Sequence, residues 1–488
     1  MTAPIRVRYA PSPTGYPHVG NIRTAIFNWL FARHQGGSFI LRLEDTDLAR
    51  TVEGAAEAIL ESLLWLGLDW DEGPEVGGAF GPYIQSQRLP LYHETAGRLL
   101  RQGAAYLCYC SPERLDQMRA EQARRKQPPG YDRRCRELSP DERKALESSG
   151  VKPVVRFKIP LEGQTTFTDI IRGEVTFQNS TLDDFVLLKS DGYPTYHLAN
   201  IVDDHEMQVS DVLRAEEWLS STPRHLLLYA AMGYEPPRFA HLPMILGPDR
   251  SKLSKRHGAT ALLEFREQGY LPEAMLNFLT LLGWSLDDHT ELMSREEIVS
   301  NFSLERVSQT AAIFNHQKLE WMNGVYIRHL SPDEFTRRML PFLEKGLPPE
   351  VTRPVPFEYA RRLAPLIQER TKTLAETVAL TDFFFVEQLQ YEASLLLDKG
   401  LSREMAIQAL KTARERIETL DQFDSASLEG LLRPLATGVG MNASGFFGLL
   451  RVAVTGRKAA PPLFQTMEAL GRQRCLDRME MALAGLQR

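Results

Sequence analysis

A short segment near the start of the chain has the residue types needed to hold a triphosphate. A Pro- and Gly-rich turn over residues 11–17 leads into Pro17-His18-Val19-Gly20-Asn21, where a helix is predicted to begin. The unpaired N–H groups and partial positive charge of a helix N-terminus suit phosphate, and Gly20 lets a nucleotide approach the backbone closely. His18 could donate to phosphate oxygens as negative charge grows on them. The alternative is an ordinary helix start with an incidental histidine.

A second segment, Lys252-Leu253-Ser254-Lys255-Arg256, follows a turn that contains Gly247 and Pro248. Two lysines on a loop of this kind can swing onto phosphates and neutralise a leaving pyrophosphate. Taken alone, such a run is more often a solvated basic loop. Together, the two segments favour phosphate binding over the ordinary alternative for each.

Three of the four cysteines lie close together in the sequence, at Cys108, Cys110 and Cys135. Thiolates suit zinc, and a tetrahedral structural site needs four donors. The alternative is that these cysteines are buried or incidental. Cys475 stands alone in a helical region and is expected to belong to the core.

The elements around the first segment predict a doubly wound parallel sheet. Residues 5–9 alternate as a short strand does, and residues 22–34 have helical periodicity with Ile22, Ile26, Trp29 and Leu30 on one side. A second strand is predicted over 38–43 and a second amphipathic helix over 53–66. Strand, turn, helix and strand in this order are typical of a Rossmann-like α/β fold.

Residues 110–190 differ from this pattern and predict an inserted α+β domain, with an Arg-rich opening and a strand over 154–159. The α/β pattern is expected to return at 184–188 and to continue through 209–213. After about residue 260 the sequence is helical almost throughout. The predicted fold is thus a Rossmann-like α/β domain with an insertion, followed by an all-α C-terminal half.

The composition is that of an ordinary globular protein, since 43% of the 488 residues are hydrophobic and 25% are charged. The sequence contains no run of about 20 apolar residues, so no membrane partner is expected. The few cysteines and the lack of an apolar leader favour the cytoplasm. A net charge of −6 argues mildly against a general polyanion binder, although local basic faces would still allow a nucleic acid to bind.

The two phosphate-handling segments resemble the two signatures of class I aminoacyl-tRNA synthetases. The lead-in Pro11-Ser12-Pro13-Thr14-Gly15 is similar to that of the glutamyl/glutaminyl branch, and Arg256 stands where many members have serine. Further similar segments are 42–47, 191–200, 214–218 and 318–324. The resemblance to the bacterial glutamyl-tRNA synthetase family therefore covers essentially the whole chain.

This resemblance implies a pocket for L-glutamate, whose two carboxylates and one ammonium call for cations, hydroxyls and an anion. The residues implied for it are Arg8, Ala10, Ser12, Glu44, Tyr196, Asn200 and Arg214. Arg8 and Arg214 can each form forked bonds to a carboxylate, and Glu44 would face the ammonium. The alternatives are a strand-edge surface arginine for Arg8 and a helix-surface pair for Tyr196 and Asn200.

For ATP, the resemblance implies His18 and Gly20 at the triphosphate and Glu217 and Trp218 near the adenosine. Lys252 and Lys255 would clamp the phosphates in the transition state, so the implied catalytic residues are His18, Gly20, Lys252 and Lys255. Trp218 could equally be an ordinary core residue. Family members use Mg²⁺ with the ATP, and catalysis would be positional and electrostatic.

The resemblance also implies four regions and a metal. The regions are a catalytic domain over 1–109 and 191–246, an inserted acceptor-binding domain over 110–190, a stem-contact helical domain over 247–324 and an all-helical anticodon-binding domain over 325–488. The cysteine cluster is similar to a zinc knuckle in which tyrosine takes one place, so the implied zinc ligands are Cys108, Cys110, Tyr131 and Cys135. Glu137 stands where a histidine ligand can occur.

The expected function is activation of glutamate with ATP and its transfer to tRNA(Glu) by a monomeric enzyme. Whether tRNA(Gln) is a second substrate stays open, because Arg370 and its neighbour Gln368 do not decide the anticodon specificity. A paralogue that glutamylates a modified tRNA base would lack the helices after residue 325. A non-catalytic tRNA-binding homologue would be expected to have lost His18, Lys252 or Lys255. A general nucleotidyltransferase would not need the glutamate pocket.

Overall fold

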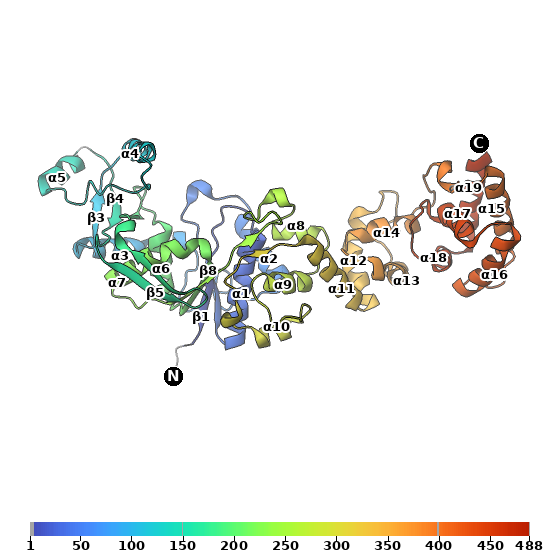
Figure 1. Cartoon of the computed structure of the whole chain (residues 1–488), viewed down its shortest axis with the longest axis horizontal. Helices are drawn as coiled ribbons and strands as arrows, with labels where there is room; N and C mark the ends of the chain where they lie inside the picture. The colour runs from blue at the N-terminus through green and yellow to red at the C-terminus, as the bar shows by residue number, and fades with distance from the viewer. Residues whose placement is uncertain (1–3, 149, 398–399, 488) are drawn as a thin grey trace. The chain divides into compact units, whose positions relative to one another are not determined.

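The computed structural model describes residues 4–148, 150–397 and 400–487 (Figure 1). The chain forms two compact units, one with Met1–Glu264 and Met275–Asn315 and the other with Phe265–Ala274 and His316–Arg488. All strands among the described residues belong to the first unit. They are β1 Arg6–Tyr9, β2 Ser38–Leu41, β3 Ala105–Cys108, β4 Val154–Phe157, β5 Gln164–Asp169, β6 Gly173–Gln178, β7 Val186–Leu188, β8 Asp211–Ala215, β9 Arg238–Leu242, β10 Ile245–Leu246 and β11 Ala312–Ile313.

Helices connect these strands in the first unit and make up the regular structure of the second. In chain order they are α1 Val19–Gln35, α2 Ala55–Trp65, α3 Leu89–Arg101, α4 Pro112–Arg124, α5 Pro140–Ser148, α6 Tyr196–Glu206, α7 Thr222–Met232, α8 Leu262–Glu267, α9 Pro272–Leu281, α10 Arg295–Asn301, α11 His316–His329, α12 Pro332–Gly346, α13 Phe357–Ile367, α14 Glu376–Phe385, α15 Arg403–Glu418, α16 Ser425–Gly438, α17 Ala443–Thr455, α18 Leu463–Leu470 and α19 Arg472–Gln487. Among the described residues, no helix combines the length and the apolar character needed to cross a bilayer.

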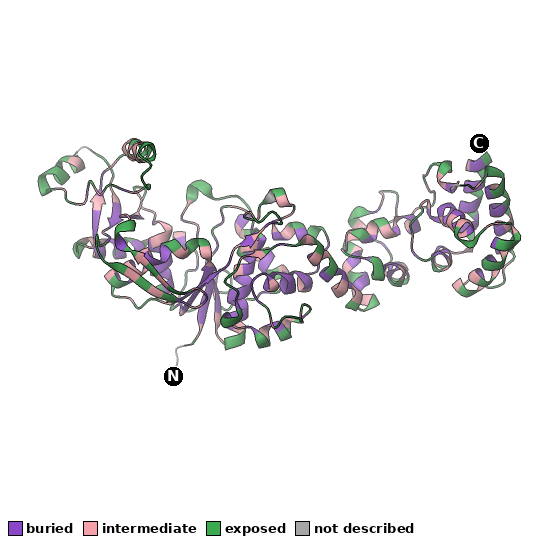
Figure 2. Ribbon diagram, viewed as in Figure 1, coloured by how far each residue is buried: buried purple, intermediate pink, exposed green. Residues whose placement is uncertain are grey.

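Parallel strands form the centre of the first unit, as the sequence predicts. β1 pairs in parallel with β2, and β8 pairs in parallel with β9, which also pairs with β5. The backbone N–H of Ser210 donates to the carbonyl of Arg6 over 2.9 Å, so β1 and β8 lie side by side. All four residues of β1 are buried, which suits a parallel strand covered on both faces (Figure 2).

A second, antiparallel sheet in the order β3-β4-β7 stands apart from the parallel strands. The segment 184–188, where the α/β pattern was expected to return, does contain a strand, β7, but it pairs antiparallel with β4 and not with the parallel strands. A three-residue apolar strand carries no sequence signal for which sheet it joins. Beside this sheet, α4 and α5 have no buried residues and are largely exposed in Figure 2.

Helix α1 begins within the predicted segment 17–21 and is buried on more than one side. The side chain of His18 caps it by accepting a hydrogen bond from the backbone N–H of Gly20. At its other end Gly36 takes a left-handed conformation with φ of 63°, which ends a helix at little steric cost. Phe27 and Asn28 are buried as well as the predicted apolar face, because the helix packs against both β1 and α10. Its position fixes His18 at the end of β1.

The second unit is all helical among its described residues. Two sets of buried side chains form its interior, one centred on α12 and α13 and the other on α15 to α19. The predicted all-α half thus holds, although helical structure begins less cleanly than expected after residue 260. The short strand β11 intervenes, paired in parallel with β10.

Candidate active site

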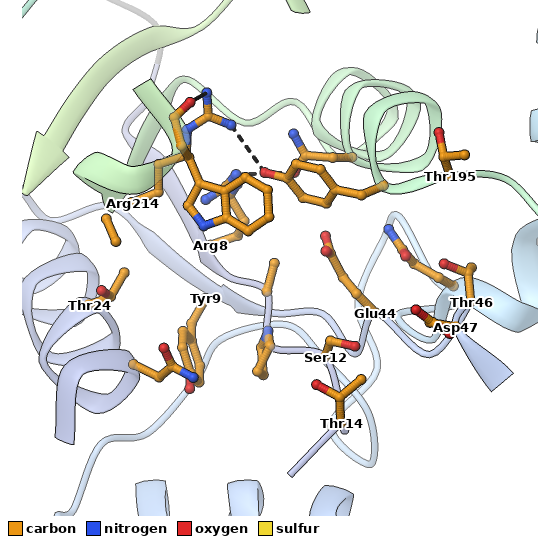
Figure 3. A pocket seen from close by; sticks show the side chains of 18 of the residues that line it. Arg8, Tyr9, Ser12, Thr14, Thr24, Glu44, Thr46, Asp47, Thr195 and Arg214 are labelled. Carbon is orange, nitrogen blue, oxygen red and sulfur yellow. Dashed lines mark hydrogen bonds between the residues drawn. The ribbon is translucent and has the colours of Figure 1, made fainter. Parts of the chain in front are cut away.

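A cavity of about 620 Å³ opens in the first unit beside the carboxyl ends of β1, β2 and β8 (Figure 3). Ligands of doubly wound sheets bind at this edge, where loops leave the strands. All seven residues predicted for glutamate line the cavity: Arg8, Ala10, Ser12, Glu44, Tyr196, Asn200 and Arg214. Of the residues predicted for ATP, His18, Glu217 and Trp218 also line it. We call this space the β1/β8 cavity.

Arg8 is buried at the end of β1, and side chains of α6 hold its guanidinium in place. Its Nε donates to Asp204 Oδ1 over 3.0 Å, and its Nη2 donates to Asn200 Oδ1 over 3.2 Å. Burial alone would raise the pKa of Asp204, but Arg8 and Arg42 outweigh it and hold that pKa below its usual range. The surface alternative for Arg8 is therefore wrong, since a buried, ionised carboxylate fixes its guanidinium.

Arg42 and Asp204 also belong to the site, although neither was predicted from the sequence as a site residue. Arg42 is fully buried, and it donates to Asp204 Oδ1 over 2.8 Å and to Glu44 Oε1 over 3.1 Å. Asn200 and Asp204 are four residues apart, so they share one face of α6. That spacing was the available signal, because two polar residues on the buried face of a helix need partners.

Three acidic residues line the cavity, Glu44, Asp47 and Glu217, and of these Glu44 is buried and points into it in Figure 3. Burial raises its pKa to about 7, although Arg42 and Arg8 act in the opposite direction. Both guanidiniums are shared with Asp204, which weakens their hold on Glu44. A carboxylate of this kind would gain from a bound cation that completes its charge balance.

Arg214 is buried at the end of β8, and its contacts are of a different kind. Its Nη1 donates to the hydroxyl of Tyr196 over 3.1 Å, drawn as a dashed line in Figure 3. Its Nε donates to His241 Nε2 over 3.0 Å, and its Nη2 donates to Thr222 Oγ1 over 2.8 Å. Among the described residues, Arg214 has no carboxylate partner, so its positive charge is uncompensated at the cavity wall.

His18 and Gly20 meet the expected geometry at the start of α1. The Nδ1 of His18 accepts from the N–H of Gly20 over 3.1 Å, so the ring carries its proton on Nε2. Burial and the nearby Lys252 both lower the pKa of His18, which favours the neutral ring. A Cβ at Gly20 would lie 2.9 Å from the ring, so only glycine fits while His18 keeps this position. Gly20 itself does not line the cavity.

The basic loop reaches toward the same edge. Lys252 Nζ makes an ion pair of 2.7 Å with Glu217 Oε2, and both side chains are exposed. Lys255 begins a 3-10 helix, Lys255–His257, but its side chain lies outside the described part of the chain. Trp218 is 38% exposed and its ring centre lies 4.5 Å from that of Tyr196, so the core alternative for Trp218 is wrong.

The cysteine cluster also assembles as predicted. The sulfur atoms of Cys108, Cys110 and Cys135 all lie within 4.8 Å of one another. The Tyr131 hydroxyl lies 3.3 Å from Cys108 Sγ and 3.5 Å from Cys110 Sγ. Glu137 is not part of the cluster, because its carboxylate pairs with Lys158 over 3.4 Å and is mostly exposed. The three sulfurs are donors that suit zinc, and the Tyr131 hydroxyl supplies a fourth donor atom beside two of them.

Comparison with known proteins places this geometry in a family. The family described as the catalytic domain of class I tRNA synthetases for E and Q matches residues 4–321, and an anticodon-binding domain matches residues 334–483. A glutamate–tRNA ligase of Dehalococcoides mccartyi (strain CBDB1) is 60% identical over 100% of this chain and 98% of its own.

The chain belongs to the glutamate–tRNA ligase family of class I aminoacyl-tRNA synthetases.

Other known proteins are also similar to this synthetase. A glutamate–tRNA ligase of Moorella thermoacetica is 50% identical over 98% of both chains. A crystal structure of a glutamate tRNA ligase from Elizabethkingia meningosepticum, in complex with its amino acid, is 38% identical with a TM-score of 0.86, and covers 98% of this chain and 99% of that one. The predicted family, fold class and enzyme class, an ATP-dependent aminoacyl-tRNA synthetase, are thereby confirmed.

Proposed function

We propose that this synthetase joins L-glutamate to the 3′-terminal adenosine of tRNA(Glu) in two steps. The substrate carboxylate attacks the α-phosphorus of ATP and pyrophosphate leaves. A terminal ribose hydroxyl of the tRNA then attacks the mixed anhydride, which releases AMP. The observation that carries the proposal is the composition of the β1/β8 cavity, whose buried charged residues are two arginines, Arg8 and Arg214, and one carboxylate, Glu44, which match the charges of glutamate.

The glutamate ligands follow from this match. Arg214 and the hydroxyl of Tyr196 suit one carboxylate of the substrate, and Arg8 suits the other. Glu44, ionised, suits the ammonium. Ala10, Ser12 and Asn200 complete the wall, with Asn200 also orienting Arg8. A substrate amino acid with a neutral side chain would leave Arg214 without an anion. An unpaired charge at a buried site is costly in free energy.

The phosphates of ATP belong at the start of α1. The Nε2–H of His18 and the helix N-terminus can hold phosphate oxygens, and Gly20 leaves room for them. Lys252 and Lys255 then stabilise charge on the leaving pyrophosphate, for which Lys252 exchanges Glu217 for phosphate. Glu217 and the exposed ring of Trp218 are available to the adenosine. Mg²⁺ bound with the ATP supplies further charge neutralisation.

Zn²⁺ is proposed for the cysteine cluster, with Cys108, Cys110, Tyr131 and Cys135 as ligands. Its role is structural, since four protein ligands leave no open position for a substrate. The helices α4 and α5, which lie next to the cluster in the chain, have no buried residues and so add little to a core there. A bound metal would compensate for that small core.

The tRNA is assigned to three further regions. Residues 110–190 bind its acceptor end, 247–324 contact its stem and 325–488 bind its anticodon, beside the catalytic domain of 1–109 and 191–246. A cavity of about 440 Å³ lined by Trp321, Arg328 and Lys372 offers a ring and the Arg328 cation to a nucleic acid, whereas Lys372 pairs with Glu320 over 3.4 Å. Gln368 is buried and donates to two backbone carbonyls, whereas Arg370 is exposed. Arg370 is therefore the better candidate for an anticodon contact.

The test is glutamylation by the purified full-length protein, with ATP and Mg²⁺, of separate tRNA(Glu) and tRNA(Gln) transcripts. Charging of tRNA(Glu) alone defines a discriminating enzyme, and charging of both defines a relaxed one. No charging of either, with an active control enzyme alongside, contradicts the proposal and favours a tRNA-binding homologue. We further propose a monomer in the cytoplasm, which sedimentation and cell fractionation would check.

A further inference from the structure

Buried side chains surround Arg214 and hold it without neutralising it. All five N–H groups of its guanidinium have acceptors, and every acceptor is an uncharged atom. Besides His241, Thr222 and Tyr196, they are His225 Nδ1 at 3.2 Å and the backbone oxygen of Trp218 at 3.4 Å. Arg8 differs, because the buried carboxylate of Asp204 pairs with it directly.

One of these acceptors depends on the position of a single proton. His241 can accept from Arg214 only if its own proton is on Nδ1. That proton is fixed by Asp169, whose Oδ2 lies 2.6 Å from His241 Nδ1. Asp169 and His241 are fully buried, so water cannot take over either contact. The carboxylate acts on Arg214 through the imidazole and does not touch the guanidinium.

A second acceptor depends on a proton in the same way. His225 Nδ1 faces Arg214, so the ring carries its proton on Nε2, which lies 3.0 Å from His197 Nδ1. Burial lowers the pKa of His225 well below its usual range and lowers that of His197 to about 4. Burial also lowers the pKa of His241. Neutral imidazoles are the forms that can accept from an arginine.

We infer that Asp169 and His241, with His225, are positioning residues that orient Arg214 through neutral acceptors and leave its full positive charge for the side-chain carboxylate of the substrate. The inference rests on the proposed assignment of Arg214 to glutamate. A carboxylate in contact with Arg214 would have oriented it equally well, but would have cancelled the charge that selects an acid over an amide.

The test uses a matched set of variants in the full-length protein. Asp169→Asn keeps the shape, but its amide oxygen is needed by the backbone N–H groups of Ile171 and Arg172, which bind Asp169 Oδ1 at 3.0 and 2.9 Å. The backbone N–H of His241 loses Oδ2 at 3.1 Å as an acceptor but keeps Oδ1 at 3.3 Å. The amide nitrogen then faces His241 and moves the ring proton to Nε2, where it opposes Arg214. His241→Gln places an oxygen where Nε2 was, whereas His241→Asn retains only the Nδ1 position.

We expect Asp169→Asn and His241→Asn to raise the KM for glutamate at least about tenfold in the tRNA(Glu) charging assay, with the KM for ATP unchanged. His241→Gln should stay within about threefold of the parent, because it still offers an acceptor. Adding Asp169→Asn to His241→Gln should then cause no further loss. That last result separates control of the proton from general damage to the fold.

Three results would overturn the inference. The first is an unchanged KM for glutamate in Asp169→Asn. The second is a rise in that KM on adding Asp169→Asn to His241→Gln that equals the rise Asp169→Asn causes in the parent, and the third is an equal rise in His241→Gln and His241→Asn. If Asp169→Asn does not fold, the two His241 variants decide alone. Arg214→Ala tests the underlying assignment separately. If it leaves the KM for glutamate unchanged, the glutamate assignment fails; if it raises the KM while Asp169→Asn does not, only the positioning role fails.

Discussion

Glu44 gives the site a pH dependence at the scale of one residue. Its pKa of about 7 means that it is mostly protonated at pH 6 and mostly ionised at pH 8. Only the ionised form attracts the substrate ammonium, so the KM for glutamate should fall about tenfold from pH 6 to pH 8. Steady-state charging at saturating ATP and tRNA checks this.

Glu44→Gln is the control for that prediction. The amide cannot ionise, so its KM for glutamate should be high and nearly constant over the same pH range. A flat profile in the parent enzyme, or an unchanged slope in Glu44→Gln, would show that another group is responsible.

Gly20 carries a prediction of the same scale. In Gly20→Ala the new methyl would lie 2.9 Å from the His18 ring, which must turn and lose its contact with the helix N-terminus. Because the Nε2–H then points away from the phosphates, kcat should fall at least about tenfold. Gly430→Ala is the matched control, since Gly430 lies in α16 with open space around it, and it should charge tRNA normally. Equal activity of both variants would contradict the role of His18.

At the scale of elements, the knuckle that carries Cys108 to Cys135 should hold one zinc ion per chain. Elemental analysis of the purified protein should find it, and Cys110→Ser should lose it because one of four ligands is gone. Cys475→Ala and Glu137→Gln should retain the metal, since Cys475 is buried alone and Glu137 pairs with Lys158. Zinc retained in Cys110→Ser, or absent from the parent protein, would contradict the proposed zinc site.

At the scale of the whole molecule, two compact units with separate interiors should unfold separately. Arg478 offers a probe of the second unit. It is buried and donates 2.6 Å hydrogen bonds to the carbonyls of Val454, Phe383 and Val386. Arg478→Leu leaves these carbonyls unpaired and should lower the free energy of unfolding of that unit by about 2–4 kcal/mol.

Scanning calorimetry measures this directly. Two transitions are expected, of which Arg478→Leu lowers only one, and addition of ATP and glutamate should raise the other. A single transition that Arg478→Leu shifts as a whole would mean that the two units unfold together.

The sequence by itself determined the chemistry and most of the element order. His18 and Gly20 had to lie together at a helix start, because two residues of spacing and a Pro/Gly turn leave few other conformations. β1, α1 and β2 lie where periodicity predicts them, within a few residues. Local patterns of this kind depend on neighbours in the chain, so they can be recognised without the fold.

Only the tertiary structure decided which distant residues share the site. Asp169 and His241 have no local motif, and Asp204 has only its spacing from Asn200. They matter because α6, β5 and β9 bring them to Arg8 and Arg214. The sheet that β7 joins was undecidable for the same reason, since strand pairing depends on partners far along the chain. The charge state of Glu44 and the uncompensated charge of Arg214 likewise follow from burial, which is a property of the packed molecule.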